Sequence, residues 1–508
     1  MAEAALGNPG ATSWPDPQSA SEVVRRMQAK LHRWAGADRS RRFGDLFNLV
    51  YDPAFLVCAW QRVAANAGAR TPGVDRATVA RIRTQLGVEA FLQHVRDLLK
   101  QGEFQPVEVR QVLIPKASGS GKLRKLGIPT VADRVVQASL KAVLEPIFEA
   151  DFQPCSYGFR PNRRAHDAIA EIHYLASEPR NYRWVLEADI AACFDEIDHV
   201  ALVERLRARI TDKRIVALVK AFLKAGVMTT TGDREQTLTG TPQGGILSPL
   251  LANIALSRLD DHFAQQWRQQ MATDYQRAKR KRAGLANWRL IRYADDFVVV
   301  VSGERRHAEA LREEVAAVLA PLGLRLAPEK TRVVHIDEGL DFLGFGIRRM
   351  RKRGTSRHVV YTVPSKKAIQ QVKDTVKAKT SRHTLHLAPD ELIVSLGWSL
   401  RGWATYFRHA VAKQVFGHLD QHAWWRLANW LRRKHRIGWK QLRRRFCDQG
   451  WRIAYKGAVF TGAASVAITR YRYRGSTIPT PWTPPSAATT GSHHRLTSGQ
   501  RHVESPVR

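Results

Sequence analysis

The chain has little cysteine and no long apolar run. Its four cysteines lie far apart in 508 residues and form no CxxC pair: Cys58, Cys155, Cys193 and Cys447. This spacing argues against a disulfide scaffold and a zinc module, and it predicts reduced, buried thiols. No apolar stretch reaches the length of a membrane-spanning helix, and no basic stretch leads into a signal-type apolar segment. We therefore expect a soluble, cytoplasmic protein with no membrane partner.

Acidic residues are scarce relative to basic ones. The chain has 81 Lys and Arg against 46 Asp and Glu, which gives a formal net charge of +35 and a pI near 10.7. Such an excess repels itself unless a polyanion neutralises it. An anionic membrane surface is the competing partner, but the missing apolar segments count against it. The composition thus predicts a nucleic-acid partner.

Hydrophobic periodicity divides the chain into several parts, as its length leads us to expect. Residues 1–40 have the pattern of a loose tail that leads into a helix near Ser21–Ala35. Over Phe43–Phe345, helical stretches alternate with short β-branched strands, which is an α+β pattern. Beyond Met350 the chain turns helical, and after about Gly475 its rising Pro, Ser, Thr and Gly content predicts disorder.

Local patterns place particular elements within these parts. The expected strands are Val109–Ile114, Trp184–Ile190 and Ile291–Val301, and the expected C-terminal helices are Pro389–Tyr406 and Gln421–Arg445. The run Lys279–Arg282 is interpreted by default as a solvated charged loop. A contact with a nucleic-acid backbone is the alternative for this run.

Two adjacent carboxylates, Asp295 and Asp296, lie between two apolar segments. A hairpin turn would present both acids together at its tip. Asp is a common turn residue, and for an isolated Asp-Asp pair that interpretation would prevail. Upstream, however, the predicted strand at Trp184–Ile190 carries Asp189 near its end. Three carboxylates that converge from two neighbouring strands would form a site of hard oxygen ligands.

Such a site suits Mg²⁺, which prefers octahedral oxygen ligands and keeps water for substrate phosphates. Two Mg²⁺ ions about 3.5–4 Å apart can activate the attacking hydroxyl and stabilise the leaving oxygen of a phosphoryl transfer. The three acids favour an enzyme over a pure binding module, because a binding module has no need to keep mutually repelling carboxylates together.

Around these carboxylates the chain resembles the reverse transcriptases encoded by group II introns. Seven fragments in the order of that family carry the resemblance: Val112–Lys116 (VLIPK), Arg124–Pro129 (RKLGIP), Ser156–Pro161 (SYGFRP), Gly240–Ile254 (GTPQGGILSPLLANI), Tyr293–Asp296 (YADD), Glu329–Thr331 (EKT) and Leu343–Phe345 (LGF). Each fragment alone is a weak signal, but their order is specific. The resemblance implies an RNA-directed DNA polymerase that also acts as a maturase on its intron RNA. It implies an α+β fold, namely a right-hand polymerase with an α-helical thumb/maturase domain.

The resemblance implies catalytic and metal-binding roles for Asp189, Asp295 and Asp296, with the carbonyl of Ile190 as a further ligand of two Mg²⁺ ions. Phe194 follows Asp189 by five positions, where the family places an aromatic ring that excludes a 2′-hydroxyl. An ordinary core phenylalanine is the alternative for this position.

Four other residues match family positions that contact the incoming nucleotide. Lys116 and Arg124 correspond to cations that grip the triphosphate, a task suited to an ammonium and a guanidinium. Gln243 lies in the Pro-Gln-Gly loop, where its amide would contact nucleotide or template. Lys330 would contact or protonate the pyrophosphate, with an exposed structural lysine as the alternative.

The helical C-terminal part resembles the thumb and maturase region of the family. Its tryptophans are expected in the core, whereas the cations between them would face RNA phosphates and give salt-dependent affinity. The candidate RNA-binding residues are Arg401, Arg426, Arg443, Arg444 and Arg445. Many family members end in a zinc-supported HNH endonuclease, but this chain has neither the paired cysteines nor the length. No endonuclease activity is therefore expected.

The implied organisation has five parts. They are a flexible N-terminal tail at 1–40, an extension with the start of the fingers at 41–110, fingers and palm at 111–350, a thumb/maturase region with room for a DNA-binding extension at 360–465, and a disordered tail at 475–508. The expected partners are group II intron RNA, an RNA template, a DNA primer or target, and dNTP substrates, and a homodimer is left open. The alternatives are a splicing-only RNA-binding maturase and a related reverse transcriptase recruited to defence or diversity generation.

Overall fold

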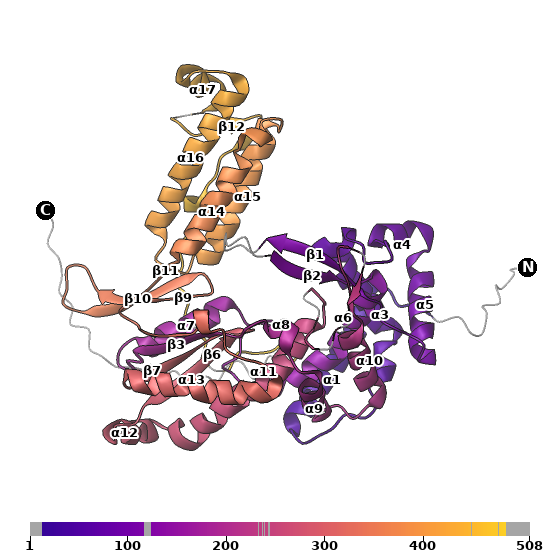
Figure 1. Cartoon of the computed structure of the whole chain (residues 1–508). Helices are drawn as coiled ribbons and strands as arrows, with labels where there is room; N and C mark the ends of the chain where they lie inside the picture. The colour runs from indigo at the N-terminus through magenta and orange to yellow at the C-terminus, as the bar shows by residue number, and fades with distance from the viewer. Residues whose placement is uncertain are drawn as a thin grey trace, which may run out of the picture.

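The computed structural model describes residues 13–483, apart from 116–122 and the single positions 232, 236, 238, 242, 243, 449 and 476. Figure 1 shows N-terminal helices on one side, a central sheet flanked by helices, and a group of long helices that projects away from them. This mixed architecture confirms the α+β class expected from the sequence. The contacts predicted for Lys116 and Gln243 fall outside the described residues.

The N-terminal region consists of helices packed around one another. They are α1 (Pro17–Ala37), α2 (Phe47–Val50), α3 (Pro53–Ala65), α4 (Val79–Gln85), α5 (Val88–Gln101) and α6 (Val131–Glu149). Asp16 caps α1 by accepting a hydrogen bond from Gln18 N over 2.9 Å, and Pro17 occupies a first-turn position that needs no donor. Helix α1 packs against α3 and α6, so the helix expected near Ser21–Ala35 is confirmed.

A small sheet lies beside these helices, with the strand order β2-β1-β4-β5. Its strands are β1 (Val109–Pro115), β2 (Leu123–Ile128), β4 (Val227–Met228) and β5 (Arg234–Glu235). Strands β1 and β2 pair antiparallel, and Arg124 lies opposite Ile114. The strand predicted at Val109–Ile114 is confirmed, and its partner carries the predicted triphosphate ligand Arg124.

The central sheet has the order β6-β7-β3-β8 and is antiparallel throughout. Its strands are β3 (Trp184–Asp189), β6 (Asn287–Tyr293), β7 (Asp296–Ser302) and β8 (Arg332–His335). Val298 and Val300 of β7 belong to one core cluster, whereas Phe297, Val299 and Val301 belong to another. Because alternate side chains point to opposite faces and both faces are covered, the strand is an unbroken apolar run.

Helices cover both faces of this sheet, with α7 on one face and α13 on the other (Figure 1). The helices of this region are α7 (Ala165–Ala176), α8 (Cys193–Glu196), α9 (His199–Arg207), α10 (Lys213–Lys224), α11 (Ser248–Gln266), α12 (Asp274–Arg282) and α13 (Arg305–Leu319). The strands predicted at Trp184–Ile190 and Ile291–Val301 are confirmed, the second as a hairpin. The loop predicted at Lys279–Arg282 is wrong, because the run is the last turn of α12. Thr273 and Gln276 start that helix as a reciprocal capping box.

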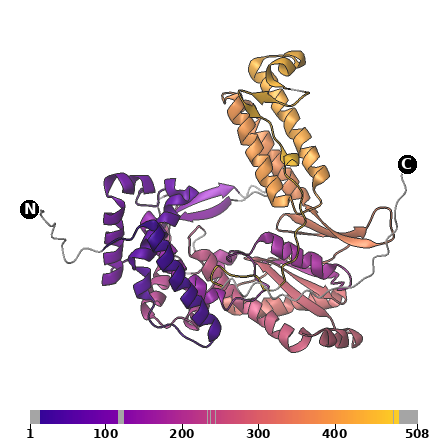
Figure 2. The ribbon, with the colours of Figure 1, turned by 180° about the vertical axis from the view of Figure 1, so that it is seen from behind.

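A three-stranded sheet of order β11-β10-β9 leads into the projecting helices, which Figures 1 and 2 show from both sides. The elements are β9 (Leu340–Phe342), β10 (Phe345–Arg351), β11 (His358–Pro364), α14 (Lys366–Lys379), α15 (Pro389–Phe407), α16 (Lys413–His435), α17 (Trp439–Phe446), β12 (Ala454–Tyr455) and β13 (Ala458–Val459). The helix predicted at Pro389–Tyr406 is confirmed. The single helix predicted at Gln421–Arg445 is wrong, because Arg436 adopts a left-handed φ of 52° and separates α16 from α17.

The described end of the chain returns to its beginning. We call residues 469–483, apart from 476, the C-terminal strap. Tyr471 Oη donates to Asp167 Oδ1 of α7 over 2.8 Å, and Trp482 Nε1 donates to Gln28 Oε1 of α1 over 3.3 Å. Ile478 is buried. The disorder predicted for 475–508 is therefore wrong for the described residues up to 483.

The prediction of a flexible tail through residue 40 is also wrong from Pro17 onward. Helix α1 buries Ala20, Val24, Leu31 and Ala35 in the core, because their spacing places them on one helical face. The sequence pattern detected the helix but not its burial, which depends on distant segments.

All four cysteines are free thiols, in agreement with the prediction. Cys155 and Cys193 are buried, whereas Cys58 and Cys447 are half-buried, so the expected burial is correct for only two of them. None of the described helices combines the length and the apolar character needed to cross a bilayer.

Candidate active site

Asp189 and Asp296 lie directly opposite each other at one end of the central sheet, in the antiparallel register of β3 and β7. Asp295 lies beside them because a tight turn joins β6 to β7, with Tyr293 paired to Asp296. The structure thus brings together on adjacent strands the three carboxylates that the sequence singled out.

The turn itself has a conformation that its surroundings must maintain. Ala294 has a φ of 58°, which non-glycine residues rarely adopt. A Cβ built on Gly158 would lie only 2.3 Å from Ala294 N, so a glycine is required at this close approach. Tyr157 N donates to Arg292 O, and Arg292 N donates to Cys155 O, each over 2.8 Å. These contacts attach the segment around Gly158 to the strand that leads into the turn.

A buried ion pair supports the turn from within the protein. Arg292 Nε donates to Asp260 Oδ1 over 2.7 Å, and neither side chain is exposed. The same guanidinium donates to Ala294 O over 2.8 Å and to Asn253 Oδ1 over 3.0 Å. Asn253 Nδ2 in turn donates to Gly158 O over 2.9 Å. The network therefore links α11, the Gly158 segment and the carboxylate-bearing turn.

Sequence reasoning missed Arg292, Asp260 and Asn253. A partial signal was present, because a charged Arg292 interrupts an apolar strand and Asn253 and Asp260 are seven positions apart in α11. That spacing places the two α11 residues on one helical face. Their partner could not be identified without the tertiary structure.

The carboxylates of Asp189, Asp295 and Asp296 lie close together in a largely desolvated site and repel one another. Burial raises the pKa of Asp295 and the charge of Asp189 adds to the rise, whereas Arg124 and Lys330 oppose it. Asp296 is open to solvent on one side, yet the surrounding protein and the charges of Asp295 and Asp189 raise its pKa to about 6. Lys330 Nζ forms an ion pair with Asp189, and this hydrogen bond raises the pKa of the ammonium. The site therefore favours the arrival of further positive charge.

An oxygen-only donor set of this kind fits a hard divalent cation such as Mg²⁺. Within the described ranges, no three His, Cys, Asp or Glu side chains are already gathered at one metal-binding point. Asp189 is instead neutralised by Lys330. Ile190, the predicted carbonyl ligand, follows β3 and is held by an isolated bridge to Leu326. The donor chemistry fits the cation, and Lys330 at present occupies one carboxylate oxygen of Asp189.

Phe194 lies in α8, soon after the Asp189 strand, and is half-buried. Its carbonyl accepts a hydrogen bond from Thr241 N over 2.5 Å. A Cβ on Gly240 would lie 2.4 Å from that carbonyl, so Gly240 and Thr241 rest directly on the Phe194 segment. A half-buried ring is compatible both with the predicted sugar contact and with core packing.

The five arginines predicted to bind RNA have different surroundings. Arg443, Arg444 and Arg445 are exposed on α17, which contains no acidic residue. Arg401 and Arg426 are half-buried, and their guanidinium groups donate to neighbouring protein oxygens. The exposed α17 arginines are therefore the more accessible group for a polyanion.

Comparisons with known proteins agree with one another. Residues 114–347 match the family model described as reverse transcriptase (RNA-dependent DNA polymerase), and residues 369–447 match the model described as group II intron, maturase-specific domain. The chain is 39% identical over 363 residues to protein YkfC of Escherichia coli (strain K12), which covers 68% of this chain and 94% of YkfC.

Two intron-associated relatives are longer than the part that matches. The group II intron-encoded protein LtrA of Lactococcus lactis subsp. cremoris is 32% identical over 357 residues, which covers 62% of this chain and 58% of LtrA. An uncharacterized 91 kDa protein in the cob intron of Schizosaccharomyces pombe is 30% identical over 374 residues, which covers 63% of this chain and 44% of that protein. The chain thus spans about half the length of these two relatives.

Proposed function

We propose a two-metal mechanism of DNA synthesis on RNA for this chain, which belongs to the RNA-directed DNA polymerases and maturases encoded by group II introns. The observation that carries this mechanism is the register that sets Asp189 opposite Asp296, with Asp295 in the adjoining turn. The raised pKa of Asp296 and the ion pair between Asp189 and Lys330 support a site that takes up cations.

In this proposal the chain has the arrangement of a right-hand polymerase. The central sheet is the palm, β1 and β2 belong to the fingers, and α14, α15 and α16 form the thumb. The support is that the carboxylates lie at an end of the central sheet, while Arg124 on β2 is close enough to lower the pKa of Asp295. A primer-template would then lie between the small sheet and the projecting helices.

Asp189, Asp295, Asp296 and the carbonyl of Ile190 would hold two Mg²⁺ ions. When bound, these ions would supply Lewis-acid activation of the primer 3′-hydroxyl and neutralisation of the pyrophosphate. Lys330 would move from Asp189 toward the phosphates, which it would contact or protonate, because a bound cation takes over the neutralisation of that carboxylate.

The other nucleotide contacts proposed here are those implied by the family pattern. Lys116 and Arg124 would bind the triphosphate, and Gln243 would contact the nucleotide or the template. Phe194 would lie against the sugar and exclude a 2′-hydroxyl by steric clash. Gly240 and Thr241, shortly before Gln243 in the sequence, contact the Phe194 segment, which supports a shared nucleotide pocket.

We propose that the chain also binds its intron RNA, assists splicing and copies the intron during its mobility. The match to a maturase-specific domain and the exposed arginines of α17 support this role. The bound RNA would lie along the outside of the projecting helices, and its affinity would depend on salt.

Primer extension on an RNA template tests the mechanism. Asp295→Asn preserves size but removes a ligand charge, so we expect Mg²⁺-dependent extension to be lost while RNA binding is retained. Asp97→Asn on α5 is the matched control and should extend normally. Extension by Asp295→Asn close to that of the unmodified protein would refute the site. Splicing activity without any extension by the unmodified protein would identify a splicing-only maturase instead.

A further inference from the structure

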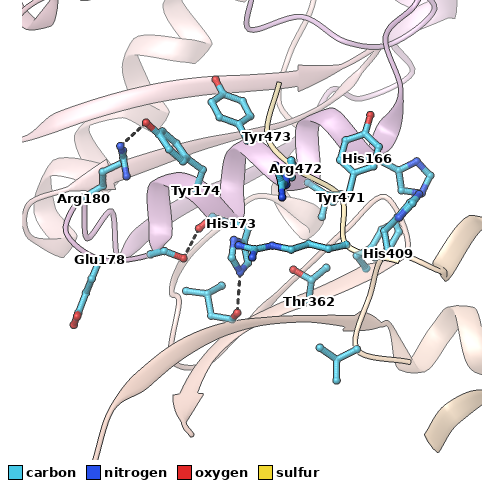
Figure 3. Close-up of a pocket in the computed structure, with 17 residues that line it drawn as sticks. His166, His173, Tyr174, Glu178, Arg180, Thr362, His409, Tyr471, Arg472 and Tyr473 are labelled. Carbon is cyan, nitrogen blue, oxygen red and sulfur yellow. Dashed lines mark hydrogen bonds between the residues drawn. The ribbon is translucent and has the colours of Figure 1, made fainter. Parts of the chain in front are cut away.

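A cavity of about 630 Å³ lies outside the active site, between α7, β11 and the C-terminal strap (Figure 3). None of the three catalytic carboxylates lines it. Its size is in the range of small-ligand and nucleotide pockets. Its walls come from four segments of the chain, at 166–180, 345–362, 409–411 and 470–473, and the strap supplies the last of them.

The strap forms its side of the cavity because carboxylates of α7 hold it. Asp167 accepts hydrogen bonds from Tyr471 Oη over 2.8 Å and from Arg474 Nε over 2.7 Å. Glu171 accepts a hydrogen bond from Tyr473 Oη over 3.3 Å and pairs with Arg289. These two carboxylates are therefore neutralised by the protein itself.

The remaining charge of the lining is positive. Three arginines, Arg180, Arg470 and Arg472, line the cavity with one carboxylate, Glu178, which leaves an excess of two positive charges. Arg180 lies 3.5 Å from the centre of the Tyr174 ring. Arg470 and Arg472 are exposed, and in the described part of the chain neither is in an ion pair. An anionic group such as a phosphate would be attracted to these two side chains.

Aromatic rings form another part of the lining. The rings of Tyr174 and Tyr473 are 4.7 Å apart at an angle of 31°, and Tyr174 remains 37% exposed. Tyr471 and His409 form a second pair at 4.9 Å. Because Arg180 lies over the Tyr174 ring and Tyr473 lies beside it, only part of this aromatic surface is open. Aromatic rings beside arginines are the combination that binds unpaired bases by stacking and their phosphates by charge.

One buried polar atom in the lining has no partner. Thr362 is a half-buried residue of β11 that lines the cavity, and its Oγ1 has little accessible surface and lacks a hydrogen bond among the described residues. A buried hydroxyl without a partner is costly, and a ligand that supplies one relieves the cost. A ribose 2′-hydroxyl can both donate and accept, which favours RNA over DNA at this position.

We propose that this cavity binds one unpaired nucleotide of an RNA strand. The base would lie against Tyr174 and Tyr473, the flanking phosphates would contact Arg470 and Arg472, and the ribose would hydrogen-bond to Thr362. The exposed position of the two arginines leaves room for the strand to continue on either side. This assignment rests on RNA being a partner of the chain, as proposed above, but not on the polymerase site.

Crosslinking to the full-length protein tests the site. A short unstructured oligouridine that carries 4-thiouridine is irradiated with the protein, and the attachment points are mapped by mass spectrometry. We expect attachment at Tyr174 or Tyr473, competed by unmodified RNA better than by DNA of the same sequence or by free UMP. Absence of attachment at both tyrosines would overturn the site. Equal competition by DNA, or preferential competition by UMP, would overturn the assignment to an RNA strand.

Two variants give the quantitative arm. Arg470→Gln with Arg472→Gln should weaken attachment at this site about tenfold and lower the slope of log affinity against log salt by roughly 1.4, for two lost phosphate contacts. Arg305→Gln with Arg306→Gln on α13 removes the same charge elsewhere and should change neither the attachment at this site nor the slope of log affinity against log salt. Thr362→Val should reduce the preference for RNA over DNA. Equal effects of the two arginine pairs would contradict a local site.

Primer extension by the same protein preparations separates this inference from the proposed mechanism. Extension on a short primer-template should persist in the Arg470→Gln, Arg472→Gln variant. Loss of extension by the unmodified protein with normal crosslinking would refute only the polymerase mechanism. Normal extension without crosslinking would refute only the nucleotide site.

Discussion

Arg292 and Asp260 form an ion pair that has no contact with solvent, and the same arginine donates to the carbonyl of Ala294 in the turn that carries Asp295. One side chain therefore contributes both to the buried ion pair and to the geometry of the proposed active site. Removing one partner of a buried pair leaves the other charge uncompensated, whereas removing both can be nearly neutral.

Asp260→Asn should lower the free energy of unfolding by about 3–5 kcal/mol, as expected for a broken buried pair. The double variant Asp260→Leu, Arg292→Met should recover most of this loss in urea unfolding. Its kcat for primer extension should nevertheless stay low, because Ala294 O has lost its donor. Recovery of extension together with stability would show that the pair acts on stability alone.

Phe194→Ala should increase the efficiency of ribonucleotide incorporation relative to deoxyribonucleotide incorporation, because the smaller side chain leaves space for the 2′-hydroxyl. The expected change in the ratio of kcat/KM values is about 10- to 200-fold, as for a pocket contact of about 1–3 kcal/mol. Phe104→Ala, which removes another half-buried ring, is the matched control and should leave the ratio unchanged. A parallel fall of both efficiencies in Phe194→Ala would mark a packing residue.

Replacement of Arg443, Arg444 and Arg445 by Ala should weaken intron binding and splicing but spare extension on a short template. Each lost phosphate contact should reduce the slope of log affinity against log salt by roughly 0.7–0.9 in a filter-binding titration. The exposed α13 arginines Arg305, Arg306 and Arg312 provide a charge-matched triple variant.

The two triple variants have distinct outcomes. An unchanged slope with normal splicing in the α17 variant would make its arginines a solvated helix face. Loss of extension together with splicing would indicate damage to the projecting helices rather than to an RNA contact.

Asp133 gives a dependence of stability on pH, because burial raises its pKa to about 6. The folded state holds this proton more tightly than the unfolded state, so the resulting stability is present below the unfolded pKa and is lost as the pH rises through 6. As the pH rises from 5 to 8, the free energy of unfolding of Asp133→Asn should therefore fall by roughly 1 kcal/mol less than that of the unmodified protein. Urea unfolding at both values measures this, and an identical pH dependence of the two proteins would contradict it.

The sequence was sufficient where a signal is local. The strand before Asp189 and the hairpin around Asp295 follow from short β-branched apolar runs that end at carboxylates. Helix α12 was also predictable, because Thr273 and Gln276 have the spacing of a capping box. The charged run Lys279–Arg282 favoured a loop instead. The sequence predicted that Asp189 and Asp296 converge from neighbouring strands, but not the register that pairs them.

Features that depend on distant segments were not predictable from one sequence. The pairing of Arg292 with Asp260 joins a strand to a helix 32 positions away. The break between α16 and α17 contains Gly438, the N-cap of α17, which was a local signal, but apolar residues at helical spacing continue on both sides of it and predicted a single helix. Helix α1 also receives a hydrogen bond from Trp482, which lies 454 positions from its partner Gln28.

The hydrogen bond between Trp482 and Gln28 can form only after residue 482 has been synthesised. Helix α1 is translated 454 positions ahead of this contact, so the nascent chain lacks the hydrogen bond from Trp482 to Gln28 until the strap has been made. The cavity beside α7 is likewise incomplete until then. A chain interrupted before the strap would contain Asp189, Asp295 and Asp296 but would lack the wall that carries Arg470 and Arg472.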